Sequence, residues 1–338
     1  MTAKTWGLVS RALPAAVLVA SCWGAASLDL AAGGALSLAS GFLAAILILL
    51  EGPSRWIAAG VALLGQTALA FLNGAGLAGA LAGDLRSLAV ATVAALLALR
   101  FCGARRRRLS LRVLGLIVVA AIVPAGVIAG AGDAVMKGAA AGSSFLDPWA
   151  TSAFRDGLGL AVVLPAALLL AKSPRYGDFR RSMIEAAALL AALGGLTLAI
   201  FFAPGASRFF LIFPAVTFVA LRLGPRGAAL GAFLVAAIAI LGALMGHGPA
   251  ALDPRLGLAG RLGLTLIFAA AVHFTALTAG GAQADRTRLW RLLTARDRAA
   301  RAAAARARKA ESELAEMALE PIDEVDREPS LSTVPIQA

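Results

Sequence analysis

Ten apolar segments follow one another along the chain, separated by short stretches that hold most of the charged residues. A helix that crosses the hydrocarbon core of a bilayer needs roughly 20 mainly apolar residues, because its backbone polar groups must be satisfied within the segment. The pattern therefore predicts an all-α, polytopic membrane helix bundle with about ten transmembrane helices. The ten segments are residues 8–28, 35–50, 56–72, 85–100, 112–131, 155–171, 183–203, 208–222, 227–245 and 261–281. The second and the eighth are short, so a count of eight remains open.

The composition also indicates a membrane protein. Of the 338 residues, 60% are apolar and 15% are charged, a balance that a water-soluble domain does not need. The net charge of +12 would suggest a nucleic-acid partner in a soluble protein, but these arginines lie between apolar segments or beyond the last one, so we expect no nucleic-acid binding. The two cysteines, Cys22 and Cys102, indicate no disulfide framework. VASC at 19–22 resembles a lipoprotein cleavage site, yet the apolar run continues past it, which favours an uncleaved first span.

Positive charges recur in alternate loops between the apolar segments. By the positive-inside rule, these loops face the cytoplasm, and an even number of spans places both termini there as well. The patch Arg105, Arg106, Arg107 and Arg108 is the strongest topology signal and the expected contact with lipid headgroups. The other cations in these loops are Lys4, Arg11, Arg55, Arg100, Arg112, Lys172, Arg175, Arg180, Arg181, Arg222 and Arg226.

The chain changes character after the last apolar segment, which predicts three parts. Residues 1–283 form the integral membrane domain, 284–320 a helix that is first basic and then acidic, and 321–338 a disordered tail. The helix carries a thin, alanine-dominated heptad stripe, which favours at most a weak coiled coil, so a homodimer through 284–320 and a solvated single helix both remain open. Its basic stretch, Arg286–Lys309, is also suited to anionic lipid headgroups.

Residue patterns that would carry enzyme chemistry are weak. GAGLAG at 74–79 has the glycine spacing of a dinucleotide-binding turn, but no strand precedes it and no acidic residue follows at the ribose distance. Gly79 with Gly83 and Gly227 with Gly231 are better explained as places where helices approach closely. His247 and His273 lack further ligands at metal-binding spacing. We therefore expect no enzyme, no cofactor and no metal site.

Two apolar segments contain polar residues that are candidates for function. In FRDGLGLAVVLPAALLL, 154–170, Arg155 and Asp156 are expected at the outer interface, where their side chains can reach water, with Pro165 about 13 Å deeper as a kink. Pro124 and Pro214 would repeat that kink in other segments, although prolines are also ordinary in membrane helices. His273, near the middle of the tenth segment, is either a functional polar contact or a neutral histidine bonded to a neighbouring carbonyl.

The same segment, FRDGLGLAVVLPAALLL, resembles the Asp-x-x-Gly…Pro segment of the bacterial membrane-associated sensor domain of the first type (MASE family). FPAVTFVALRLGPRGAALGAFLVAAIAILGALMGHGP, 213–249, is similar to that family's Phe-Pro…Ala-x-Arg-x-Gly-Pro-Arg-Gly stretch and its closing Gly-x-Gly-Pro. SGFLAAILILLEGPSRW, 40–56, is similar to its early Gly…Leu-Leu-x-Gly segment, but LAS replaces the family's Trp-Pro-Pro before Gly41. The resemblance covers roughly residues 10–283.

The resemblance implies a sensory module of the bacterial inner membrane, normally fused to a histidine kinase, a diguanylate cyclase or a cyclic-dinucleotide phosphodiesterase. No motif of such an output domain follows the last span here. The expected partner is a separate cytoplasmic kinase or cyclic-dinucleotide enzyme; a remnant of a longer sensor, or a different function, remains open. The leading hypothesis is a sensor whose unknown ligand binds among the helices from the outer side and moves the tenth span. Arg155, Asp156, Pro165 and His273 are its expected sensing or gating residues. A small-solute transporter and a membrane scaffold for a signalling enzyme are the alternatives.

Overall fold

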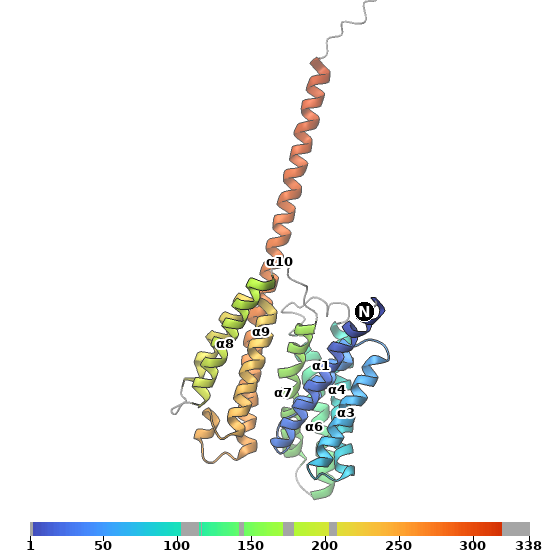
Figure 1. Ribbon diagram of the computed structural model, residues 1–338, viewed down its shortest axis with the longest axis vertical. Helices are drawn as coiled ribbons and strands as arrows, with labels where there is room; N and C mark the ends of the chain where they lie inside the picture. Colours follow the sequence, from blue (N-terminus) through green and yellow to red (C-terminus); the bar gives the residue numbers. More distant parts are fainter. Residues whose placement is uncertain are drawn as a thin grey trace, which may run out of the picture. The chain divides into compact units, whose positions relative to one another are not determined.

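The computed structural model describes residues 3–102, 115, 117–141, 145–171, 179–202 and 208–319, and within these ranges the chain is helical, without a β-strand (Figure 1). The predicted all-α class is therefore confirmed. The chain divides into two units, Met1–Asp285 and Arg286–Ala338. The predicted arginine patch 105–108 lies outside the described residues, and its role remains a prediction.

The described helices follow the apolar segments closely. Each of the ten predicted segments falls on helix where it is described, except for residues at segment ends, namely 35–37, 50, 208 and 245. Seven helices are long and apolar enough to cross a membrane, and the apolar helices Leu38–Leu49 and Val118–Gly132 are shorter. The elements are α1 (Ala3–Ala31), α2 (Leu38–Leu49), α3 (Ser54–Leu72), α4 (Leu77–Cys102), the π-helical turn η2 (Val118–Ile122), α6 (Val123–Ala141), α7 (Leu146–Ala171), α8 (Phe179–Phe202), η3 (Phe209–Leu211), α9 (Ile212–Leu244), η4 (Pro249–Leu252) and α10 (Leu258–Leu319).

Helix α9 is two helical arms joined at Gly224, which has non-helical angles of φ 71° and ψ −160°. A Cβ added at Gly231 would lie 3.5 Å from Val219 and 3.6 Å from Val216. Residues 12 and 15 positions apart would be about 18 Å or more apart along one straight helix, so the chain must reverse at Gly224. The arm before Gly224 corresponds to the predicted eighth segment, 208–222, and the arm after it to the ninth, 227–245. The prediction of ten crossings likewise counts them as two.

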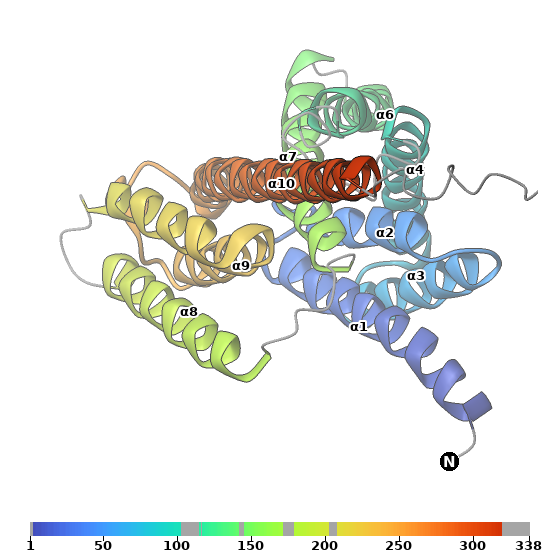
Figure 2. The same cartoon turned by 90° about the horizontal axis from the view of Figure 1, so that it is seen from above.

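Two buried clusters hold the first unit together. The larger one takes its side chains from α1 to α7 and from parts of α9 and α10, and the smaller one is centred on α8, α9 and α10. Figure 2 shows α1, α2 and α3 side by side, and α8 beside α9. Alanine predominates in both clusters, which lets the helix backbones approach closely without a bulky side chain between them.

Close backbone contact is tightest where α2 crosses α7. A Cβ at Gly159 would lie 2.1 Å from the Ser37 carbonyl oxygen, and a Cβ at Gly41 would lie 2.6 Å from Val163 Cβ. The predicted close approach at Gly231 is confirmed, since a Cβ there would lie 3.1 Å from Leu193 of α8, but nothing lies within 4 Å of a Cβ at Gly79 or Gly83. The prediction that helices approach closely at Gly79 and Gly83 is therefore wrong, because small residues permit close packing but do not cause it.

The three prolines predicted as kinks occupy different helical positions. Pro165 lies inside α7, as expected. Pro124 is the second residue of α6, just after the π-helical turn η2, whose wider hydrogen-bonding pattern accommodates the missing proline N–H. Pro214 is the third residue of α9, where the first turn has no intrahelical acceptor for its N–H. The prediction of a mid-helix kink at Pro214 is therefore wrong.

Replacing Gly159 with Ala should destabilise the protein, because the new Cβ would overlap the Ser37 carbonyl. Overpacking of this kind costs about 1–3 kcal/mol or more. Gly157→Ala, on the same helix with nothing within 4 Å of its Cβ, is the matched control. Thermal unfolding in detergent should show a lower midpoint for Gly159→Ala alone; equal midpoints for the two variants would contradict the α2–α7 contact.

Candidate functional site

A buried ion pair joins two helices that are far apart in the sequence. Arg86 on α4 donates through Nη2 to both carboxylate oxygens of Asp156 on α7, at 2.9 and 3.1 Å. The Asp156 side chain is 1% exposed and that of Arg86 27%. An ionised carboxylate in apolar surroundings is stable only when a counter-charge and hydrogen-bond donors surround it, so Arg86 is the residue that permits Asp156 at this depth.

A second arginine links the same carboxylate to the loop between α1 and α2. Arg155 Nε lies 3.7 Å from Asp156 Oδ1, and Arg155 Nη1 donates to the carbonyl oxygen of Gly34 at 2.8 Å. Gly34 adopts a positive φ of 77°, a conformation that glycine takes without strain. The Arg155 side chain is 17% exposed, and Gly34 is exposed, so Arg155, like Arg86, is partly accessible from outside the bundle.

Asp29 completes the arrangement by capping α2. Its two carboxylate oxygens accept from the backbone N–H groups of Leu38 at 3.3 Å and Ala39 at 3.4 Å. The N-terminus of a helix carries partial positive charge, which a carboxylate stabilises. The Ser37 hydroxyl, which precedes the helix, interacts instead with the Ser40 hydroxyl at 3.2 Å. Asp29 therefore performs from α1 the capping that Ser37 does not provide.

These four residues, Asp29, Arg86, Arg155 and Asp156, form what we call the ionic cluster. Arg155 and Asp156 also act on Asp29 through Coulomb interaction, so the cluster connects α1, α2, α4 and α7. Two guanidinium groups that are partly accessible can bind an anionic group, since each offers several N–H donors in a fixed plane. An anion that competes with Asp156 for them would change the contacts among four helices.

The structure corrects one expectation for this site. Asp156 does not reach water at the interface, because its side chain is buried and held by Arg86. Sequence reasoning also missed Arg86. The available signal was an arginine within the apolar segment 85–100, because an intramembrane charge implies a partner elsewhere in the bundle. Pro165, nine positions further along α7, is buried as well and is separate from the cluster.

His273 is fully buried on α10. Its Nδ1 lies 2.9 Å from the carbonyl oxygen of Ala269, which is the neighbouring-carbonyl arrangement considered from the sequence. Its Nε2 has no hydrogen-bond partner among the described residues. The ring packs edge-on against Phe233 of α9, with the centroids 5.5 Å apart.

Aromatic contacts connect α2 with His273. Phe42, on the first turns of α2, stacks on Phe233 of α9 at a centroid distance of 6.2 Å and an interplanar angle of 20°. Phe233 in turn contacts His273 at nearly a right angle, 87°. Both distances are within the range of favourable aromatic pairs. We call Phe42, Phe233 and His273 the aromatic chain; it begins two residues beyond Ser40 at the capped end of α2 and ends on α10.

Other chemistry has little support in the described part of the chain. No group of three or more His, Cys, Asp or Glu side chains is placed to hold a metal ion there. Cys22 is buried in α1, where Gln66 Nε2 donates to its Sγ at 3.0 Å, so its surroundings are those of a packed polar contact between α1 and α3.

The long apolar helices and the buried ionic cluster together define a multi-pass integral membrane protein. The family model MASE1 matches residues 8–274, most of the chain, and the protein therefore belongs to the MASE1 family of membrane-associated sensor domains. This is a sensory family and not a catalytic one. The resemblance found in the sequence is thus confirmed. No curated protein and no solved structure matches the chain.

Asp156→Asn should destabilise the protein by about 3–5 kcal/mol, because it leaves two arginines without their buried counter-charge. The double variant Arg86→Gln/Asp156→Asn should recover part of that loss, since the uncompensated charge is smaller. Thermal unfolding in detergent measures both. Arg222→Gln, in the exposed Arg222–Glu185 pair, is the control and should cost less than about 1 kcal/mol. Strictly additive single-variant effects would contradict the pairing.

Proposed function

We propose that this protein is a sensor of the bacterial inner membrane, with both termini in the cytoplasm, that relays an external signal through α10 to a separate cytoplasmic enzyme. Membership of a sensory family supports the class. The observation that carries the relay is the aromatic chain, because it runs from the helix capped by the ionic cluster to the helix that leaves the membrane. The expected enzyme is a kinase or a cyclic-dinucleotide enzyme.

The ionic cluster is the proposed receiving site. Arg155 is partly exposed, contacts the α1–α2 loop and lies beside the buried Asp156. A ligand with a negatively charged group, or a change at the membrane surface, would alter the balance between these arginines and the two carboxylates. Because Asp29 caps α2, a change in that balance would bear directly on the position of α2.

The proposed relay then follows packed contacts. A shift of α2 would move Phe42 against Phe233, and Phe233 against His273 on α10. α10 is a single helix from Leu258 to Leu319, and an uninterrupted helix transmits a displacement or rotation along its length. Contiguity alone does not establish coupling; two populated arrangements of α10 are required, and the ligand must favour one of them.

The proposed output is the segment Arg286–Leu319 of α10, whose described side chains are exposed except for the half-buried Thr287. Its basic stretch Arg286–Lys309 is suited to anionic lipid headgroups, each near-surface cation adding about 1 kcal/mol. Leu293 and Leu314 are exposed apolar positions in the alanine-dominated heptad stripe, where a partner helix or a second copy of this chain would pack. This segment is therefore the proposed contact for the cytoplasmic enzyme and for a homodimer.

A spin label at Leu289, which is 61% exposed, tests the relay in proteoliposomes. Asp156→Asn and Phe233→Leu should each change its mobility in the electron paramagnetic resonance spectrum, and the double variant should change it no more than the larger single effect, because both act on one pathway. Phe218→Leu, an exposed position on α9, should leave the spectrum unchanged. Spectra identical to wild type for Asp156→Asn and Phe233→Leu would contradict the relay.

A photo-crosslinking residue at Leu293 tests the output in cells. Leu293 is 58% exposed, and we expect a crosslinked kinase or cyclic-dinucleotide enzyme identified by mass spectrometry. The control is the same residue at Leu64, which is 72% exposed on the apolar helix α3 and should crosslink lipid. Recovery of a second copy of the chain alone would support the homodimer and contradict the separate enzyme; recovery of lipid alone would contradict both.

A further inference from the structure

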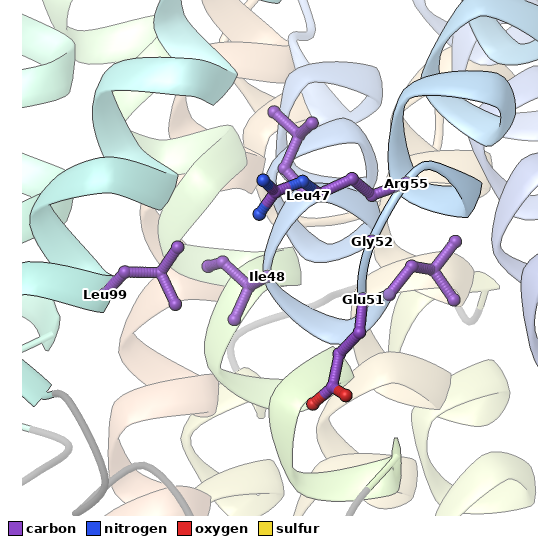
Figure 3. Close-up of a pocket in the computed structure, with 7 residues that line it drawn as sticks. Leu47, Ile48, Glu51, Gly52, Arg55 and Leu99 are labelled. Atoms are coloured by element: carbon purple, nitrogen blue, oxygen red, sulfur yellow. The ribbon is translucent and has the colours of Figure 1, made fainter.

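A cavity of about 320 Å³ lies at the end of α2 that is remote from the ionic cluster. Its apolar wall is made by Leu47, Ile48 and Leu50 around the end of α2 and by Leu99 of α4 (Figure 3). The connection from α2 to α3 adds Glu51, Gly52 and Arg55. The 12 residues of α2 separate this cavity from the ionic cluster by about 18 Å, so the two are distinct sites.

Two opposite charges line the cavity, the exposed Glu51 and the half-buried Arg55, and neither forms an ion pair with another described residue. The buried Nε of Arg55 has no hydrogen-bond partner among the described residues, and its guanidinium contacts the Trp56 ring at 5.4 Å. Glu51 forms no ion pair with Arg55 within the described ranges, and Figure 3 shows the two side chains pointing in different directions. An unsatisfied guanidinium N–H favours an oxyanion, whereas a free carboxylate favours a cation.

The end of α2 adds to the negative character on the Glu51 side. The helix ends at Leu49, and the last carbonyl groups of a helix have no intrahelical donor and carry partial negative charge. A cationic group beside Glu51 would therefore be stabilised twice, by the carboxylate and by these carbonyls.

The surroundings of the cavity place it at the level of lipid headgroups. Trp56 is 54% exposed and Ile57 is 67% exposed at the start of the apolar helix α3. A tryptophan at a helix end prefers the interface between hydrocarbon and water. An occupant that satisfies all of these features carries a phosphate, an ammonium group and hydrocarbon tails. Free phosphate leaves Glu51 and the leucine wall unused, and an anionic lipid leaves Glu51 unpaired.

We propose that this cavity binds the headgroup of a zwitterionic aminophospholipid, with its phosphate on Arg55, its ammonium on Glu51 and its acyl chains along the wall formed by Leu47, Ile48, Leu50 and Leu99. The site includes no residue of the ionic cluster or of the aromatic chain. Its volume is at the lower end of the range for small-molecule sites, which suits a headgroup rather than an entire lipid.

Native mass spectrometry of the full-length protein in detergent tests the site, with phosphatidylethanolamine and phosphatidylglycerol of identical acyl chains as probes. Wild-type protein should retain phosphatidylethanolamine more tightly. Arg55→Gln should weaken binding of both lipids about tenfold, as expected for the loss of a charge-assisted hydrogen bond. Glu51→Gln should abolish the preference between the two lipids, because it removes the ammonium partner and keeps the phosphate partner. Excess inorganic phosphate should not displace the lipid.

Two further variants make the outcome decisive. Arg100→Gln removes an exposed cation next to Leu99 on α4 and should change binding less than about twofold. Leu99→Phe fills the cavity without altering a charge and should weaken lipid binding, which preserves the test if Arg55→Gln fails to fold. Unchanged binding in Arg55→Gln or Leu99→Phe overturns the site. An unchanged lipid preference in Glu51→Gln overturns the assigned headgroup, and displacement by phosphate overturns a lipid occupant.

Discussion

The burial of one carboxylate, Asp156, constrains the arrangement of the helices around it. In an apolar bundle an ionised side chain without a counter-charge is too costly to keep, so α7 must pack where Arg86 of α4 reaches it. Arg155 beside it reaches the loop that begins α2, and Asp29 of α1 caps α2. Packing among these helices is otherwise made by small and aliphatic side chains, which fix distances but give little directional preference. The ionic cluster supplies this directional preference, because its contacts bring α1, α2, α4 and α7 together around Asp156.

The fold class was predictable because lipid leaves the backbone few choices. A segment without water must satisfy its own amides, so an apolar run of sufficient length becomes a helix almost regardless of its side chains. This explains why each of the ten segments falls on helix where it is described, apart from a few residues at segment ends. Local geometry was less predictable. The chain reverses at Gly224, which has a positive φ. The sequences around Pro214 and Pro165 are both apolar, and they did not show that Pro214 lies in the first turn of a helix while Pro165 lies inside one.

The candidate site was predictable only in part, because its contacts are tertiary. Arg155 and Asp156 stood out as charges within an apolar segment, but their depth depends on a residue 70 positions away, Arg86. The same limit applies to glycine. Gly159, which has no glycine four positions away, is where α7 touches the backbone at the start of α2, whereas the regularly spaced Gly79 and Gly83 face open space. The spacing of glycines along the sequence shows which of them share a helix face. Which helix packs against that face depends on the arrangement of all the helices in the bundle.

The short length of α2 has an electrical consequence. Its 12 residues span about 18 Å, whereas the hydrocarbon of a bilayer is about 30 Å thick. Polar groups stand at both of its ends, the ionic cluster at one and Glu51 with Arg55 at the other. Where water reaches both of these ends, the insulating layer is thinner along this helix than elsewhere, and the transmembrane voltage falls over a shorter path. Moving one elementary charge through the full voltage changes the free energy by about 2.3 kcal/mol per 100 mV, and a small displacement of Arg155 would sample a larger fraction of that energy here than in a bilayer of ordinary thickness.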